Sequence, residues 1–194
     1  MRQHLRAHAA NALTALRVVL TPVFACLVYV GDSTLVGVLA AATFAVVAAS
    51  DVWDGRVARR WDSASALGRA FDHFADIGFI LVALATYASL GLAPWWVPAS
   101  IAASFLFYVV DSWSRSSAPG GLIGSRIGHA AGVLNYALIG VLVGNDTAGI
   151  HLLSDGVLRV LFWLVPVYSG IAVSARLATR ATANGLAPRR CAST

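Results

Sequence analysis

Six long apolar segments, separated by short polar connections, constrain this chain more than any other feature of its sequence. Each is close to the 20 or so mostly apolar residues that a helix needs to cross a bilayer. They cover roughly residues 12–30, 34–53, 71–92, 95–113, 127–144 and 156–176. Hydrophobic residues make up 58% of the chain, more than a soluble domain of 194 residues can bury. We predict an all-α membrane protein with six transmembrane helices, the first being a mature span and not a removed signal peptide.

The arginines predict how these helices are oriented. All 14 basic residues are arginine, and short connections rich in arginine stay on the cytoplasmic side. They gather before the first span, between spans two and three, between spans four and five, and after the last span. Arg159, near the opposite side, is close enough to a helix end to reach the interface. We therefore predict that both termini are cytoplasmic and that residues 1–194 form one domain, with short polar tails at about 1–10 and 181–194. The arginines form no stripe with interleaved aromatics, so nucleic-acid binding is not expected.

Four aspartates flank the connection between spans two and three. Asp51 and Asp54 are three residues apart, and Asp72 and Asp76 are four apart, so each pair shares one helix face. Ionised carboxylates at membrane depth are costly, and four that converge also repel one another unless cations neutralise them. Oxygen ligands suit hard divalent cations. The four residues are therefore candidate metal ligands.

A pair of metal ions held by these carboxylates would suit the binding of a diphosphate and a displacement at phosphorus, more than hydride or acyl transfer. Arg59 is the best-placed cation for a phosphate, because its planar guanidinium can hold two oxygens. An alternative is that the aspartates are solvated and pair with the arginines of the same connection. Another is a small cation transporter, although that function predicts acidic residues near the midplane of several spans.

The same residues resemble the signature of the CDP-alcohol phosphotransferase family, also called CDP-alcohol phosphatidyltransferases. The matching pattern is Asp51-x2-Asp54-Gly55-x2-Ala58-Arg59-x8-Gly68-x3-Asp72-x3-Asp76. A softer match, Asn11-x-Leu13-Thr14-x2-Arg17-x4-Pro22, is similar to the first helix of phosphatidylglycerophosphate synthases in that family. Together the two motifs cover residues 11–76, and the later spans agree in architecture only.

The resemblance implies transfer of a phosphatidyl group from CDP-diacylglycerol to the hydroxyl of a small alcohol, with release of CMP. It implies that Asp51, Asp54, Asp72 and Asp76 bind Mg²⁺ or Mn²⁺, as two ions, and that Asp76 is also a candidate catalytic base. Residues that would shape the nucleotide pocket are Gly55, Ala58, Arg59 and Gly68. It further implies a bacterial inner or cell membrane, an active site facing the cytoplasm, and a homodimer as a common state.

The acceptor alcohol is less determined by the sequence. Relatives that use glycerol phosphate often have lysine after the last aspartate, where this chain has Ile77. The first-helix motif favours glycerol 3-phosphate, with inositol phosphate, serine or choline-type acceptors as alternatives. An acceptor phosphate would need basic partners, and Arg115 and Arg126 are the candidates, with Arg176 and Arg180 as further possibilities. Helical spacing also offers a simpler interpretation of Arg115, as an ion-pair partner of Asp111.

Overall fold

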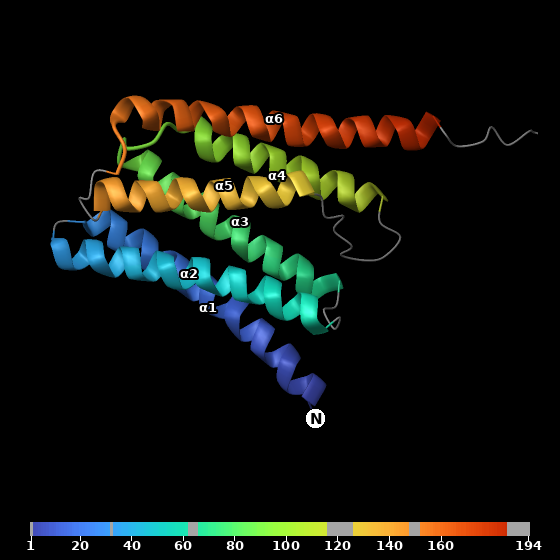
Figure 1. Cartoon of the computed structure of the whole chain (residues 1–194), viewed down its shortest axis with the longest axis horizontal. Coiled ribbons are helices and arrows are strands. Elements are labelled where there is room, and N and C mark those ends of the chain that lie inside the picture. Colours follow the sequence, from blue (N-terminus) through green and yellow to red (C-terminus); the bar gives the residue numbers. More distant parts are fainter. Residues whose placement is uncertain (1, 32, 62–65, 116–125, 148–151, 186–194) are drawn as a thin grey trace, which may run out of the picture.

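The computed structural model of this chain is a bundle of helices that run back and forth along one direction (Figure 1). It describes residues 2–31, 33–61, 66–115, 126–147 and 152–185, with side chains described for 12–31, 33–53, 68, 70–114, 127–145 and 152–181. The helices are α1 Arg2–Val30, α2 Thr34–Trp61, α3 Ala66–Ser89, α4 Trp96–Arg115, α5 Arg126–Leu142 and α6 Asp155–Gly185. A short π-helical segment, Val143–Thr147, extends α5.

Five of the six described helices are long and apolar enough to cross a membrane, which identifies an integral membrane protein. Their candidate spans are Ala12–Val30, Thr34–Trp53, Ala70–Ser89, Ile127–Asn145 and Asp155–Ala181. The remaining helix, α4, is not among them. It ends in a polar stretch in which Asp111 and Ser112 are buried inside the bundle. The all-α prediction is confirmed, while the span predicted over residues 95–113 and the orientation stay predictions.

The two ends of the described chain lie at the same end of the bundle. The start of α1 and the end of α6 lie there with the last turns of α2 and α4 and the first turns of α3 and α5 (Figure 1). The connection predicted between the spans 34–53 and 71–92 is largely helical where it is described, because α2 continues to Trp61 and α3 begins at Ala66. Polar side chains interrupt an apolar span without interrupting backbone hydrogen bonding, which explains why the predicted loop was too long.

The helices pack as two groups. Helix α1 packs against α2 and α3, α4 packs against α6, and α5 contacts α2, α3 and α6. Four aromatic rings join α1, α2, α3 and α5 in the core, namely Phe24, Phe44, Phe79 and Tyr136. Helix α5 approaches α2 closely at Gly140, where an added Cβ would lie 3.1 Å from the Phe44 ring. This packing fixes the ring of Tyr136, whose hydroxyl lines the cavity described next.

The opposite end of α3 stops at a glycine. Gly91 has a φ of 75°, which an L side chain rarely adopts, and the Leu92 amide donates to the Tyr87 carbonyl at 2.9 Å. The turn begins the connection to α4 that the sequence predicts between Gly91 and Pro94. It sends α4 back toward the end of the bundle that holds the aspartates.

Candidate active site

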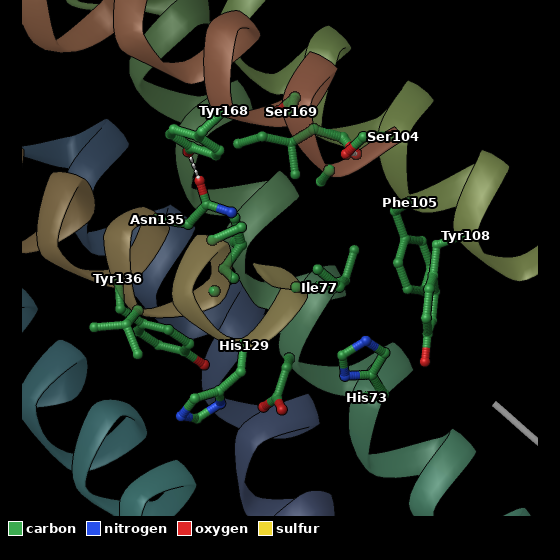
Figure 2. Close-up of a pocket in the computed structure, with 18 of the residues that line it drawn as sticks. His73, Ile77, Ser104, Phe105, Tyr108, His129, Asn135, Tyr136, Tyr168 and Ser169 are labelled. Carbon is green, nitrogen blue, oxygen red and sulfur yellow. Dashed lines mark hydrogen bonds between the residues drawn. The ribbon is translucent and has the colours of Figure 1, made fainter. Parts of the chain in front are cut away.

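A cavity of about 520 Å³ lies between α2, α3, α4, α5 and α6, and the candidate aspartates line it. Asp51 comes from α2, and Asp72 and Asp76 come from consecutive turns of α3. The other polar lining residues come mainly from α4, α5 and α6, and Figure 2 shows most of them pointing inward. They are His73, Ser104, Tyr108, His129, Asn135, Tyr136, Tyr168, Ser169 and Arg176. The structure brings together three of the four aspartates of the sequence pattern, Asp51, Asp72 and Asp76.

Arg17 of α1 is the counter-ion of two of these carboxylates. Its side chain is fully buried, its Nη1 donates to Asp72 Oδ1 at 3.1 Å, and the same nitrogen forms an ion pair with Asp76. Its Nη2 lies 3.5 Å from the hydroxyl oxygen of Ser50 on α2. The Thr14 hydroxyl also donates to Asp72 Oδ1 at 3.1 Å. The first-helix motif therefore contributes two side chains that orient the carboxylates of α3.

Asp51, Asp72 and Asp76 line the cavity, and Thr14 and Arg17 hold the carboxylates of α3. We call these five residues the carboxylate wall. Asp76 interacts electrostatically with both Asp51 and Asp72 as well as with Arg17. Among the described side chains of this wall, three carboxylates face one guanidinium, which leaves an excess of negative charge at membrane depth. Such an excess is costly without a further cation.

The carboxylate wall fits a divalent cation by donor chemistry and charge. Carboxylate oxygens are the ligands that Mg²⁺ and Mn²⁺ prefer, and one divalent ion would balance the excess negative charge. Within the described residues, no three acidic, histidine or cysteine side chains are already grouped as ligands of one ion. The side chain of Asp54 lies outside the described residues. Metal binding by the four aspartates therefore stays a prediction.

The opposite wall of the cavity is built around a buried ion pair. Arg176 of α6 donates from Nη1 to Asp111 Oδ2 of α4 at 3.2 Å, and the two side chains are 10% and 1% exposed. The guanidinium carbon of Arg176 lies 4.2 Å from the centre of the Tyr108 ring, a cation–π distance. The His73 ring packs edge-on against Tyr108, with centroids 5.3 Å apart. We call Tyr108, Asp111, Tyr168 and Arg176 the α4–α6 wall.

Two tyrosines of the cavity differ in how their hydroxyls are satisfied. The Tyr168 hydroxyl donates to Asn135 Oδ1, and Figure 2 shows this contact crossing from α6 to α5. The Tyr136 hydroxyl is buried and has no hydrogen-bond partner among the described residues. It interacts electrostatically with Asp76, Asp51, Asp72 and Arg17. Tyr136 therefore directs a polar group at the carboxylate wall.

The remaining predicted residues lie at the same end of the bundle. Gly55, Ala58 and Arg59 follow Asp54 in the last turns of α2, and Gly68 lies in the first turn of α3. Arg115 ends α4, and Arg126 begins α5. The side chains of Asp54, Ala58, Arg59, Arg115 and Arg126 are outside the described residues, so their predicted roles stay predictions. Gly68 is half-buried.

Sequence reasoning left several residues of the cavity without a role. Arg17 and Thr14 belong to the first-helix motif, but no local spacing links them to Asp72, which is more than 50 residues away. Arg176 was attributed to topology or to a possible acceptor phosphate and not to Asp111, and the expected pairing of Asp111 with Arg115 involves a side chain outside the described residues. The signal that could have found Arg17 and Asp111 is a single charge inside a long apolar segment, since such a charge needs a partner.

The bundle and its acidic cavity define an integral membrane protein with a polar site at one end of its helices. The sequence model of the family described as CDP-alcohol phosphatidyltransferase matches residues 7–171, which include Asp51, Asp72 and Asp76. The chain belongs to this family, and the resemblance that the motifs predicted is confirmed.

Two curated relatives come from Mycobacterium tuberculosis, one from strain CDC 1551 / Oshkosh and one from strain ATCC 25618 / H37Rv. Both are named "Probable phosphatidylglycerophosphate synthase". Each is 39% identical over 93 residues, which are 47% of this chain and 44% of the relative. The similarity thus spans less than half the length of either relative. Their name agrees with the type of synthase that the first-helix motif resembles.

Proposed function

We propose that this protein transfers a phosphatidyl group from CDP-diacylglycerol to the hydroxyl of a small alcohol, releasing CMP, as a step of phospholipid synthesis. The observation that supports this most is the meeting of Asp51, Asp72 and Asp76 in one cavity inside a bundle of membrane helices. Membership of the CDP-alcohol phosphatidyltransferase family agrees with this chemistry. A site at the end of the bundle is open to a lipid-linked diphosphate from the bilayer and to a polar acceptor from the cytoplasm.

Mg²⁺ or Mn²⁺ is part of the proposal, bound as two ions by Asp51, Asp54, Asp72 and Asp76. Bound metal would neutralise the diphosphate and stabilise the negative charge that develops on the departing CMP. The protein's own contribution is to hold the ligands. Arg17 and Thr14 fix the Asp72 carboxylate, and Arg17 also contacts Asp76, so both side chains of α3 are oriented before substrate arrives.

In the reaction, the acceptor oxygen forms a bond to the phosphatidyl phosphorus while the bond from that phosphorus to the CMP oxygen breaks. The acceptor hydroxyl loses its proton, and Asp76 is the proposed base. Its side chain is 17% exposed and lines the cavity, so an acceptor can reach it. Gly55, Ala58, Arg59 and Gly68, in the adjoining turns of α2 and α3, are proposed to hold the cytidine diphosphate.

Glycerol 3-phosphate is the proposed acceptor. The name of the two relatives favours it, as does the first-helix motif. Arg176 faces the cavity from the wall opposite the aspartates, where a basic group could attract an acceptor phosphate. Arg115 and Arg126 remain proposed partners for that phosphate. Inositol phosphate, serine and choline-type alcohols are the alternatives.

The test is an assay of the purified protein in detergent with CDP-diacylglycerol, Mg²⁺ or Mn²⁺, and each acceptor in turn. We expect CMP release that depends on the acceptor and is fastest with glycerol 3-phosphate. Fastest release with another alcohol would replace the acceptor and keep the reaction. The absence of CMP release with every acceptor would reject the enzymatic function.

A further inference from the structure

Tyr136 is held rigidly at the boundary between the aromatic core and the acidic cavity. Its ring stacks on Phe79 of α3 with centroids 5.9 Å apart, and Phe44 of α2 lies 6.4 Å away. These two rings, which come from different helices, restrict the direction of the Tyr136 side chain. Figure 2 shows its hydroxyl pointing into the cavity, on the side where His129 lies.

The charged groups that act on this hydroxyl are mostly anionic. Tyr136 interacts electrostatically with Asp51, Asp72 and Asp76, and with one cation, Arg17. The hydroxyl oxygen is buried, yet it has no hydrogen-bond partner in the part of the chain that the structure describes. Leaving a buried donor unsatisfied costs free energy, so such a group in a cavity needs a partner, either water or a bound ligand.

The chemistry of the carboxylate wall suggests what that partner is. A phosphate needs hydrogen-bond donors, and ionised carboxylates can only accept. Arg17 already directs its guanidinium toward Asp72, Asp76 and Ser50. A tyrosine hydroxyl supplies a donor without adding charge, and it is fixed in direction before the ligand binds.

We propose that the Tyr136 hydroxyl donates a hydrogen bond to a phosphoryl oxygen of the substrate bound at the carboxylate wall. Tyr136 is then a substrate-contacting residue of the reaction, contributed by α5 and lying outside the family signature in α2 and α3. The inference rests on the proposed function, because it assumes a phosphate-bearing substrate in this cavity.

The test compares Tyr136→Phe with Tyr168→Phe, which removes a hydroxyl from the same cavity. The Tyr136 hydroxyl is unpartnered among the described residues, whereas that of Tyr168 is bonded to Asn135. For Y136F we expect kcat/KM for CMP release to fall about 10- to 100-fold, with the ligand-free Tm unchanged or higher. For Y168F we expect the Tm to fall by about 2–4 °C, because Asn135 loses its partner, and the loss of activity to be smaller than in Y136F.

A second measurement separates this inference from the proposed function. CDP-diacylglycerol added without acceptor should raise the Tm of the wild type more than that of Y136F, whether or not turnover follows. If the lipid raises the Tm of the wild type more than that of Y136F but no CMP is released, the enzymatic function is rejected and the hydrogen bond is retained. Wild-type kcat/KM and an undiminished Tm shift in Y136F would overturn the inference. A fall in the ligand-free Tm of Y136F with a normal lipid-induced shift would also overturn it, since the role would then be structural.

Discussion

The two walls of the cavity solve the problem of buried charge in opposite ways. On the α4–α6 wall, Asp111 and Arg176 form an ion pair 3.2 Å apart, and the side chains are almost fully buried. On the carboxylate wall, Arg17 is shared between Asp72 and Asp76, while Asp51 adds a third negative charge within electrostatic range. Among the described side chains, the charges of the first wall balance, and the second wall has negative charge in excess.

This difference separates a structural use of charge from a functional one. A neutral pair can link α4 to α6 without any ligand. An excess of carboxylates raises the free energy of the protein alone and makes the binding of cations favourable. The comparison therefore predicts that replacing a carboxylate of the carboxylate wall changes chemistry and metal binding, whereas replacing Arg17 or a residue of the α4–α6 wall mainly changes stability.

Replacing the proposed base should have the largest effect on activity. Asp76→Asn keeps the size of the side chain but removes a proton acceptor and a candidate metal ligand. We expect CMP release to fall by about 10³-fold or more, with a folded protein, since Arg17 retains Asp72 as partner. The matched control is Asp155→Asn, an exposed aspartate at the start of α6, which should keep normal activity. Activity in D76N within tenfold of the wild type would show that Asp76 is not the base.

Replacing Arg17 should have the largest effect on stability. Arg17→Gln leaves the carboxylates of Asp72 and Asp76 without their guanidinium, which we expect to destabilise the protein by about 3–5 kcal/mol. Thermal unfolding in detergent measures the change. The double variant R17Q/D72N should recover part of the loss, because it removes one of the two uncompensated charges. If R17Q unfolds at the wild-type temperature, Arg17 does not offset the negative charge of Asp72 and Asp76.

The same contrast explains which parts of the site could be predicted from the sequence. The pairs Asp51/Asp54 and Asp72/Asp76 were each predicted to share a helix face because of spacings of three and four residues, and the cost of charge at membrane depth favoured their convergence on cations. That reasoning is local and needs no tertiary structure. The six helices were predicted well for the same reason, since the length of an apolar segment is a local property.

Tertiary partners could not be predicted in this way. Arg17 meets Asp72 across 55 residues of sequence, and Arg176 meets Asp111 across 65. Helical spacing offered Arg115, whose side chain lies outside the described residues, as a partner for Asp111. It did not offer Arg176, because that pairing depends on α4 packing against α6. The orphaned hydroxyl of Tyr136 is visible only in the folded structure, because its ring orientation depends on Phe44 and Phe79. Partner choice across helices is therefore the limit of the sequence-based prediction.

The ion pair of the α4–α6 wall should behave as a structural link. Arg176→Met leaves Asp111 buried without this partner, and we expect a loss of about 2–3 kcal/mol, somewhat reduced because Arg176 is 10% exposed. The double variant D111L/R176M should cost less than R176M alone, since a buried pair can be replaced by apolar side chains of similar size. Thermal unfolding of the two single variants and of the double variant gives the coupling free energy between Asp111 and Arg176. Additive losses would mean that the two residues do not stabilise one another.

The smallest expected effect is the rise in Tm when Mg²⁺ binds to the protein without substrate. It tests which of the two walls binds the ion. At ten times its dissociation constant, a bound ion stabilises the folded state by about 1.4 kcal/mol, which raises the Tm by about 3–6 °C. We expect this shift in the wild type and in R176M, because the α4–α6 wall supplies no metal ligand. In Asp51→Asn the shift should be largely lost, since one carboxylate of the wall is neutral. An equal shift in D51N and the wild type would mean that the ion binds elsewhere, and that Arg17 alone is enough to hold the carboxylates together.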